Sequence, residues 1–144
     1  MDIQTAKKRI MDFMQTNMLT VISTIDVNGN KPESAVIAFA QKDNFELIFG
    51  TYRTRRKYKN IKENNRVSFV IGWDEDYITV QYEGVASELS TSEIEIYVPI
   101  YHKKVPGASI YKSHPEQTYW KVTPAWIRYS DLSGEEEKIY EWNF

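Results

Sequence analysis

Basic side chains are concentrated in one short stretch of a chain that is acidic overall. The 144 residues carry 18 Lys and Arg against 20 Asp and Glu, which gives a formal charge of −2. Six of those cations fall within ten residues, at Arg53, Arg55, Arg56, Lys57, Lys59 and Lys62. A local excess of this kind favours an anionic ligand, because it makes one patch attractive to negative charge on a protein that otherwise repels it.

The predicted position of three of these cations strengthens that inference. We expect a short helix capped by Thr54, so that Arg55, Arg56 and Lys57 occupy its first turn. The N-terminal end of a helix already carries partial positive charge and free N–H groups, so cations there are unfavourable for the helix alone. A bound anion relieves this excess, and phosphate is the usual one. The sequence therefore predicts a phosphate site at the start of this helix, with the Thr51 hydroxyl beside it.

Two other interpretations of the cluster stay open. A solvent-exposed basic face that only keeps the protein in solution explains the charges about as well as a phosphate site does. Nucleic-acid binding is a third interpretation, with Tyr52 and Tyr58 as candidate stacking side chains. It is disfavoured because the acidic remainder of the chain cannot extend the basic surface that a polynucleotide needs.

Several common catalytic and cofactor motifs are absent from the sequence. There is no cysteine, which excludes disulfides, thiolate zinc sites and thiol nucleophiles. The two histidines, His102 and His114, have no second histidine or carboxylate at ligand spacing, so no metal site is expected. No Gly-x-Ser-x-Gly, Gly-x-Gly-x-x-Gly or Walker A sequence is present, which argues against a hydrolase elbow, a dinucleotide fold and a P-loop.

No membrane-spanning or secretory segment is expected either. The longest apolar run, Ala35–Ala40, is far shorter than the ~20 residues that a membrane helix needs. Asp2 and an early Lys-Lys-Arg have no apolar stretch behind them, unlike a secretory signal. The absence of cysteine fits a reducing compartment, and we expect a cytoplasmic protein.

Hydrophobic spacing and turn residues divide the chain into strands joined mainly by hairpins, with a few short helices. Helices are expected at 3–18, within 51–65, and from a cap at Thr91 or Ser92 to about residue 101. Strands are expected at 19–26, 32–40, 45–50, 66–72, 77–89, 119–129 and 139–144. The apolar strand 32–40 suggests burial on both faces, and Pro124 predicts a sheet edge or a bulge.

These elements predict a mainly β fold, namely a closed or nearly closed antiparallel β-barrel with peripheral helices. A doubly wound sheet is excluded because most strands have no helix between them. The length predicts one domain over residues 1–144. Aromatic residues make up 14% of the chain, an abundance that fits a packed core and a sizeable subunit interface.

Several short segments, taken in order, resemble one known family. They are Leu19–Ile25, an Asn-Gly turn with Lys31–Val36 behind it, Phe49–Thr51 followed after three residues by Arg55–Lys57, Glu63–Phe69, and Gln81–Ala86. Their order over about residues 5–130 is similar to that of the pyridoxamine 5′-phosphate oxidase-like, FMN-binding split-barrel family. The stretch 119–131 resembles the short, general-stress-protein-like members. The chain lacks the C-terminal Arg-x-His-type motif of the true oxidases.

The resemblance implies a six-stranded antiparallel split barrel that forms a homodimer and binds FMN in two clefts between the subunits. Thr51, Arg56 and Lys57 match the family's phosphate-contacting pattern. Arg55 departs from that pattern, because a small hydroxyl residue is common at its position.

The resemblance also implies contacts to the flavin ring. Ser34, Ala35 and Val36 match the strand whose backbone lies along the isoalloxazine ring. Phe49 lies at the end of the neighbouring strand, just before Gly50, and Gln81 matches a polar position near the flavin.

The functional hypothesis that follows is an FMN-binding flavoprotein. It would act as a flavin-dependent oxidoreductase on a small-molecule substrate, or as a flavin carrier or sensor, with the redox chemistry supplied by the cofactor. One alternative keeps the fold and replaces FMN with the deazaflavin F420. Another is a cofactor-free domain whose basic cluster binds an acidic protein or a nucleic acid.

Overall fold

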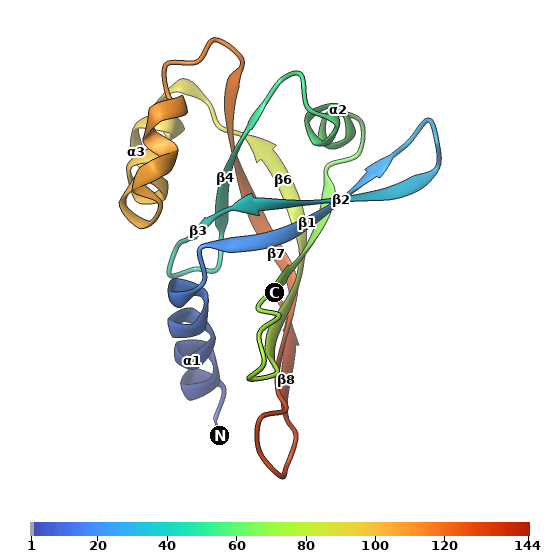
Figure 1. Ribbon diagram of the computed structural model, residues 1–144, viewed down its shortest axis with the longest axis vertical. Coiled ribbons are helices and arrows are strands. Elements are labelled where there is room, and N and C mark those ends of the chain that lie inside the picture. The colour runs from blue at the N-terminus through green and yellow to red at the C-terminus, as the bar shows by residue number, and fades with distance from the viewer. Residues whose placement is uncertain (1) are drawn as a thin grey trace.

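The computed structural model describes residues 2–144, which form one curled antiparallel sheet with helices around it (Figure 1). The strands are β1 (Leu19–Asp26), β2 (Lys31–Ala38), β3 (Ala40–Gln41), β4 (Leu47–Tyr52), β5 (Arg66–Ile71), β6 (Ile78–Glu88), β7 (Gln117–Asp131) and β8 (Lys138–Asn143). The helices are α1 (Ile3–Thr16), α2 (Arg56–Glu63), α3 (Thr91–Lys104) and the 3-10 helix η1 (Pro106–Tyr111). The predicted mainly β, antiparallel, barrel-like fold with peripheral helices is confirmed, with eight strands rather than six or seven.

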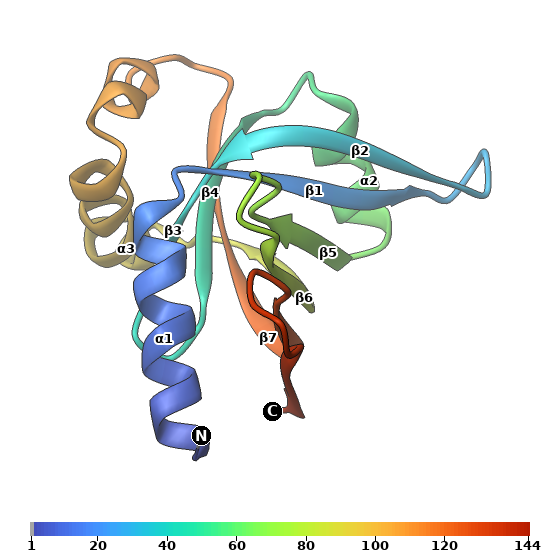
Figure 2. The ribbon, with the colours of Figure 1, turned by 60° about the horizontal axis from the view of Figure 1, so that its bottom comes forward.

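The additional strand arises because the expected strand 32–40 is interrupted at Phe39. The strand order is β2-β1-β5-β6-β7-β4-β3, so β2 and β3 lie at the two ends of the path although they are adjacent in sequence. Phe39 is fully buried and its N–H donates to the carbonyl of Met18 at 3.1 Å. Beyond this residue the chain leaves β1 and pairs with β4. One residue thus connects the two ends of the sheet and holds it curled (Figure 2).

Aromatic rings fill the inside of the curl. Phe49 stacks on Trp120 with 6.5 Å between ring centroids, and Phe69 meets both Phe49 and Tyr82 edge-on. Such offset and edge-to-face pairs add to the stabilisation from area burial alone. A second buried cluster lies between α3 and the β4–β7 pair, where Tyr101 packs against Tyr119. The sheet is therefore covered by packed side chains over β4 and β7.

The outer face of β1, β2, β5 and β6 is not covered in this way. Val36 is 60% exposed, and Ile25, Val70 and Val85 are exposed beside it. The prediction that strand 32–40 is buried on both faces is thus wrong for the chain by itself. Alternating residues of β2 point outward, and the described residues supply nothing that packs over them.

Pro124 confirms the expectation of a bulge. It pairs with Gly84 where the register between β6 and β7 shifts. On the other edge of β7, pairing with β4 ends at Val122 and pairing with β8 begins at Trp126. The missing N–H of proline therefore falls where the hydrogen-bond ladder is already interrupted.

Helix α3 begins slightly earlier than predicted. Its N-cap is Ser90 rather than Thr91 or Ser92, and Ser90 and Glu93 form a reciprocal capping box. Two backbone donors are satisfied at once by this arrangement, which is why the cap falls three residues before a glutamate. No helix within residues 2–144 combines the length and the apolar content needed to cross a membrane.

We predict that Tyr82→Phe destabilises the fold by about 1–3 kcal/mol, the cost of leaving buried polar groups without a partner. The buried Tyr82 hydroxyl lies 2.8 Å from the Phe45 carbonyl and 3.2 Å from the Val122 carbonyl, so its loss leaves both acceptors without this donor. Denaturant unfolding measures the change. The matched control is Tyr77→Phe, at a tyrosine that is 65% exposed, which should leave the free energy of unfolding unchanged. Equal stability of the two variants would contradict the assignment.

Candidate functional site

The basic cluster lies where β4 passes into α2. The N-cap of α2 is Arg55, not Thr54 as predicted from the sequence, and no side chain caps the helix. The first turn holds Arg56 and Lys57 and contains no acidic residue. Both the helix dipole and the side chains therefore place positive charge at this end.

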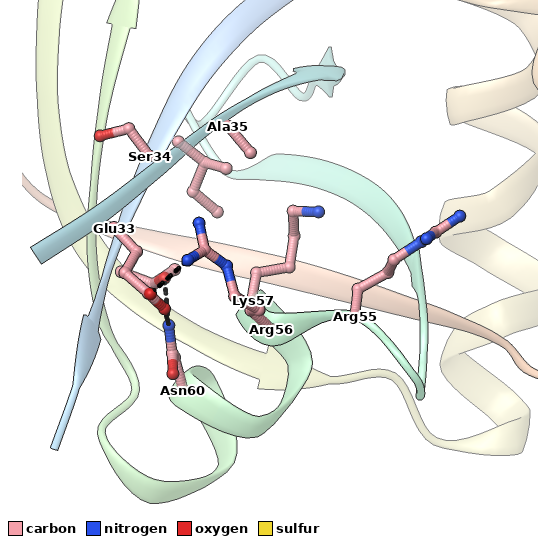
Figure 3. A pocket seen from close by; sticks show the side chains of 9 residues that line it. Glu33, Ser34, Ala35, Arg55, Arg56, Lys57 and Asn60 are labelled. Atoms are coloured by element: carbon pink, nitrogen blue, oxygen red, sulfur yellow. Dashed lines mark hydrogen bonds and ion pairs between the residues drawn. The ribbon is translucent and has the colours of Figure 1, made fainter. Parts of the chain in front are cut away.

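A hollow of about 270 Å³ separates the start of α2 from the β1–β2 hairpin (Figure 3). Its lining combines the three consecutive cations with residues of both strands: Ile22, Thr24, Glu33, Ser34, Ala35, Arg55, Arg56, Lys57 and Asn60. Five of the residues predicted for the site meet here. The Ser34 hydroxyl points away from the cations and lies 2.9 Å from the hydroxyl of Ser23.

A second hollow, of about 400 Å³, adjoins the first at Arg55 and Lys57, which line both. It contains Val36 and Thr51, two further residues of the predicted site. Its other walls are Gly50, Tyr52, Tyr111 and Gln117. We call the two hollows together the α2 groove. The groove runs from the β1–β2 hairpin, past the start of α2, to the end of β4.

A carboxylate that sequence reasoning missed lies inside this groove. The Glu33 side chain is only 10% exposed and accepts a hydrogen bond from Arg56 at 2.6 Å. Asn60 donates to the other Glu33 oxygen at 2.9 Å and to the Thr24 hydroxyl at 3.0 Å. The available signal was strand alternation, because Glu33 has the same parity as the inward-facing Ala35. Glu33 neutralises Arg56, so the groove holds three cations and one anion.

Lys57 and Thr51 are two groups of the groove that have no ion-pair or hydrogen-bond partner within residues 2–144, and Arg55 likewise has no carboxylate partner there. The pKa of Lys57 is lowered by burial, then by the neighbouring charge of Arg55, then by that of Arg56. Within residues 2–144, Lys57 forms no ion pair, and the buried hydroxyl of Thr51 has no hydrogen-bond partner. A half-buried cation and a buried hydroxyl donor, both unpaired, form a site that an anionic oxygen would complete.

The structure places two of the predicted residues outside the groove. Phe49 is fully buried in the aromatic core, where it stacks on Trp120. Gln81 lies on the outer face of β6, beside Val70 and in the same cross-strand row as Val36. Roles for Phe49 and Gln81 at a ligand stay predictions. No group of three or more acidic or histidine side chains suited to a metal ion occurs in the described part of the chain.

Comparison with known proteins supports the resemblance found in the sequence. Residues 6–131 match the family model described as pyridoxamine 5′-phosphate oxidase. No curated protein matches the sequence. Among solved structures, General Stress Protein 26 from Bacillus anthracis str. Sterne is 26% identical with a TM-score of 0.71, over 86% of this chain and 92% of that one.

Two more distant structures show the same fold. A pyridoxamine 5′-phosphate oxidase-related, FMN binding protein from Nostoc punctiforme PCC 73102 is 12% identical with a TM-score of 0.69, over 100% of this chain and 97% of that one. A heme binding protein from Mycobacterium smegmatis is 13% identical with a TM-score of 0.81, over 96% of this chain. The match covers only 57% of the heme binding protein, so this chain corresponds to little more than half of it.

We predict that Glu33→Gln tightens the binding of inorganic phosphate about threefold to tenfold, because it removes a negative charge beside the site and frees Arg56. Asn60 can still donate to the glutamine oxygen, so the fold should persist. The measurement is the rise in melting temperature with phosphate, relative to chloride at equal ionic strength. Glu88→Gln, which removes a carboxylate paired with Lys62 outside the groove, is the control and should not change phosphate binding. Weaker phosphate binding by Glu33→Gln would show that Glu33 orients Arg56 for the ligand.

Proposed function

Because the chain belongs to the pyridoxamine 5′-phosphate oxidase family, we propose that it is an FMN-binding flavoprotein that acts as an oxidoreductase on a small molecule. The observation that carries this proposal is the unpaired Lys57 beside the unpaired Thr51 hydroxyl at the uncapped start of α2. These groups match the terminal phosphate of FMN in charge and in hydrogen-bonding capacity.

The charge balance of the groove supports a phosphate monoester. Arg55, Arg56 and Lys57 carry three positive charges and Glu33 one negative charge, which leaves a net charge of about +2. A phosphate monoester carries about −1.5 to −2 at pH 7, so binding would bring the groove close to neutrality. Arg55 can offer paired N–H donors, while Lys57 acts as a point charge.

The proposed place for the flavin ring is along β2. Ala35 lines the first hollow and Val36 the second, on either side of the cations. Apolar side chains there would shield the ring from water and fix its orientation. When bound, FMN supplies the hydride or electron transfer, and the residues of the groove hold and orient it.

The proposed assembly is a homodimer with the flavin at the subunit interface. The outer sheet face is apolar at Ile25, Val36, Val70 and Val85 and is uncovered in the single chain. Exposed apolar faces of this kind mark interaction surfaces in soluble proteins. Val36 belongs both to this face and to the α2 groove, so a partner packed on the face would adjoin the proposed flavin.

We predict that the purified protein carries FMN and that Lys57→Met weakens FMN binding at least about tenfold, the loss expected for a charge-assisted hydrogen bond. Lys59→Met removes the same charge from an exposed position of α2 and is the matched control, with a much smaller effect. Mass spectrometry of the small molecule released on denaturation identifies the ligand, and flavin fluorescence gives the two affinities.

Other results of this measurement would overturn the proposal. Release of F420 would favour the deazaflavin alternative. Release of heme would indicate that this chain binds heme, as the name of the heme binding protein says of that protein. A colourless protein that takes up neither flavin but is retained on heparin at low salt would favour a polyanion-binding domain.

We predict that Val70→Lys converts the dimer to a monomer and weakens FMN binding with it. A lysine in the middle of a buried interface loses its hydration without gaining a counter-charge. Analytical ultracentrifugation measures the mass of the assembly. Ile96→Lys, at an apolar and even more exposed position on α3, should leave the dimer intact. A wild-type protein that sediments as a monomer at micromolar concentration would rule out the dimer.

A further inference from the structure

A third hollow, of about 390 Å³, adjoins the α2 groove at its β4 end. It shares Gly50, Tyr111 and Gln117 with the groove. Its remaining walls come from the end of β2, from α3 and η1, and from β7, with Ala38, Tyr101 and Tyr119 among them. We call it the α3 hollow. None of the cations of the groove lines it.

The α3 hollow holds a buried donor with no partner. Tyr119 is 6% exposed, and its hydroxyl forms no hydrogen bond within the described residues. Burial raises the pKa of Tyr119, so the hydroxyl keeps its proton at neutral pH and can donate it to a ligand. Buried polar atoms are nearly always paired, and an unpaired hydroxyl at the wall of a hollow therefore indicates a ligand atom.

Among the residues that the structure describes, no charged side chain lines the α3 hollow. His102 packs edge-on against Tyr119 with 6.0 Å between ring centroids, and its buried Nε2 is also unpaired. The pKa of His102 is lowered by burial and then by the charge of Lys112, which favours the neutral imidazole. A phosphate or carboxylate entering the hollow would lose its hydration without meeting a counter-ion.

Gly50 keeps the boundary between the two sites open. A Cβ built on Gly50 would lie 2.4 Å from the side-chain nitrogen of Gln117 and 3.4 Å from the ring of Tyr119. A side chain at residue 50 would therefore displace the end of Gln117, whereas the Tyr119 ring would stay at an ordinary contact distance. With glycine here, the boundary between the two hollows is formed by Gly50, Tyr111 and Gln117, which line both.

We propose that the α3 hollow binds the substrate of the proposed flavoprotein, and that this substrate is an uncharged, planar compound with a carbonyl-type oxygen that accepts a hydrogen bond from Tyr119. The proposal rests on the proposed flavin site, which would lie beside the hollow. Aromatic walls favour a flat ring, and the Tyr119 hydroxyl fixes where its acceptor points. The cations of the groove select the phosphate of the cofactor, whereas the neutral hollow selects against charge.

A pair of isosteric ligands tests this inference. 4-Acetylbenzamide and 4-acetylbenzoate have the same shape and differ in charge, and calorimetric titration of the purified protein, with and without added FMN, gives both affinities. We expect the amide to bind at least about tenfold more tightly than the carboxylate, because the carboxylate loses hydration without a counter-ion. Tyr119→Phe should weaken binding of the amide about fivefold, the effect of one net hydrogen bond.

Two further measurements separate a binding role of Tyr119 from a structural one. Tyr119→Phe should unfold at the same or a higher temperature than the wild type, because the hydroxyl it removes has no partner in the protein. Tyr140→Phe, at a half-buried tyrosine of β8 outside the hollow, should bind the amide as the wild type does.

The outcomes distinguish this inference from the proposed function. If FMN binds but the amide does not, if the carboxylate binds equally well, or if Tyr119→Phe binds the amide unchanged, the inference is overturned while the flavoprotein assignment stands. If the amide binds in a Tyr119-dependent manner to a protein that never takes up FMN, the hollow stands as a binding site and the flavin proposal falls.

Discussion

The site depends on one constraint: the chain does not by itself neutralise the positive charge at the start of α2. Three successive cations stand where the helix dipole is also positive, and within residues 2–144 only Arg56 of the three has a carboxylate partner in the groove. Burial and the neighbouring charges of Arg55 and Arg56 lower the pKa of Lys57, which means that its charged form is destabilised in the isolated chain. A dianionic ligand would offset the repulsion among these charges, the helix dipole and the burial of Lys57 together, and this is the basis of the proposed phosphate site.

The curl of the sheet brings residues of β2 next to the cations at the start of α2, which forms the walls of the groove. Because the strand path begins at β2 and ends at β3, the interruption at Phe39 brings β2 close to β4 and to α2. Ala35 then lines the first hollow opposite the cations, while Val36 lies on the outer face and borders the second hollow. The same closure leaves a neutral hollow beyond Gly50, so that a charged and an uncharged compartment meet at the end of β4. The charged compartment suits the phosphate of the proposed cofactor, and the neutral compartment suits the proposed uncharged substrate.

The proposed cofactor site also depends on what covers the outer face of the sheet. Val36 and Val70 are exposed although they belong to central positions of strands, and the α2 groove is open on that side. Burial of such a face stabilises association through the hydrophobic effect. A partner subunit would therefore complete both the core and the proposed cofactor site. Gln81, which lies on this face and lines neither hollow of the α2 groove, would then face the partner.

The sequence by itself determined the element types, the antiparallel barrel and the place of the basic cluster, because hydrophobic periodicity, turn residues and charge are local properties. It also predicted a sheet edge or a bulge at Pro124, since proline lacks the ladder donor, and the structure has the bulge. Tertiary structure alone decided that Phe39 splits one strand in two, that Glu33 neutralises Arg56, and that Phe49 lies in the core while Thr51 is left unpaired. These features depend on contacts between residues far apart in the chain, such as Arg56 with Glu33 and Phe49 with Trp120, and no spacing rule reports which distant side chains will meet.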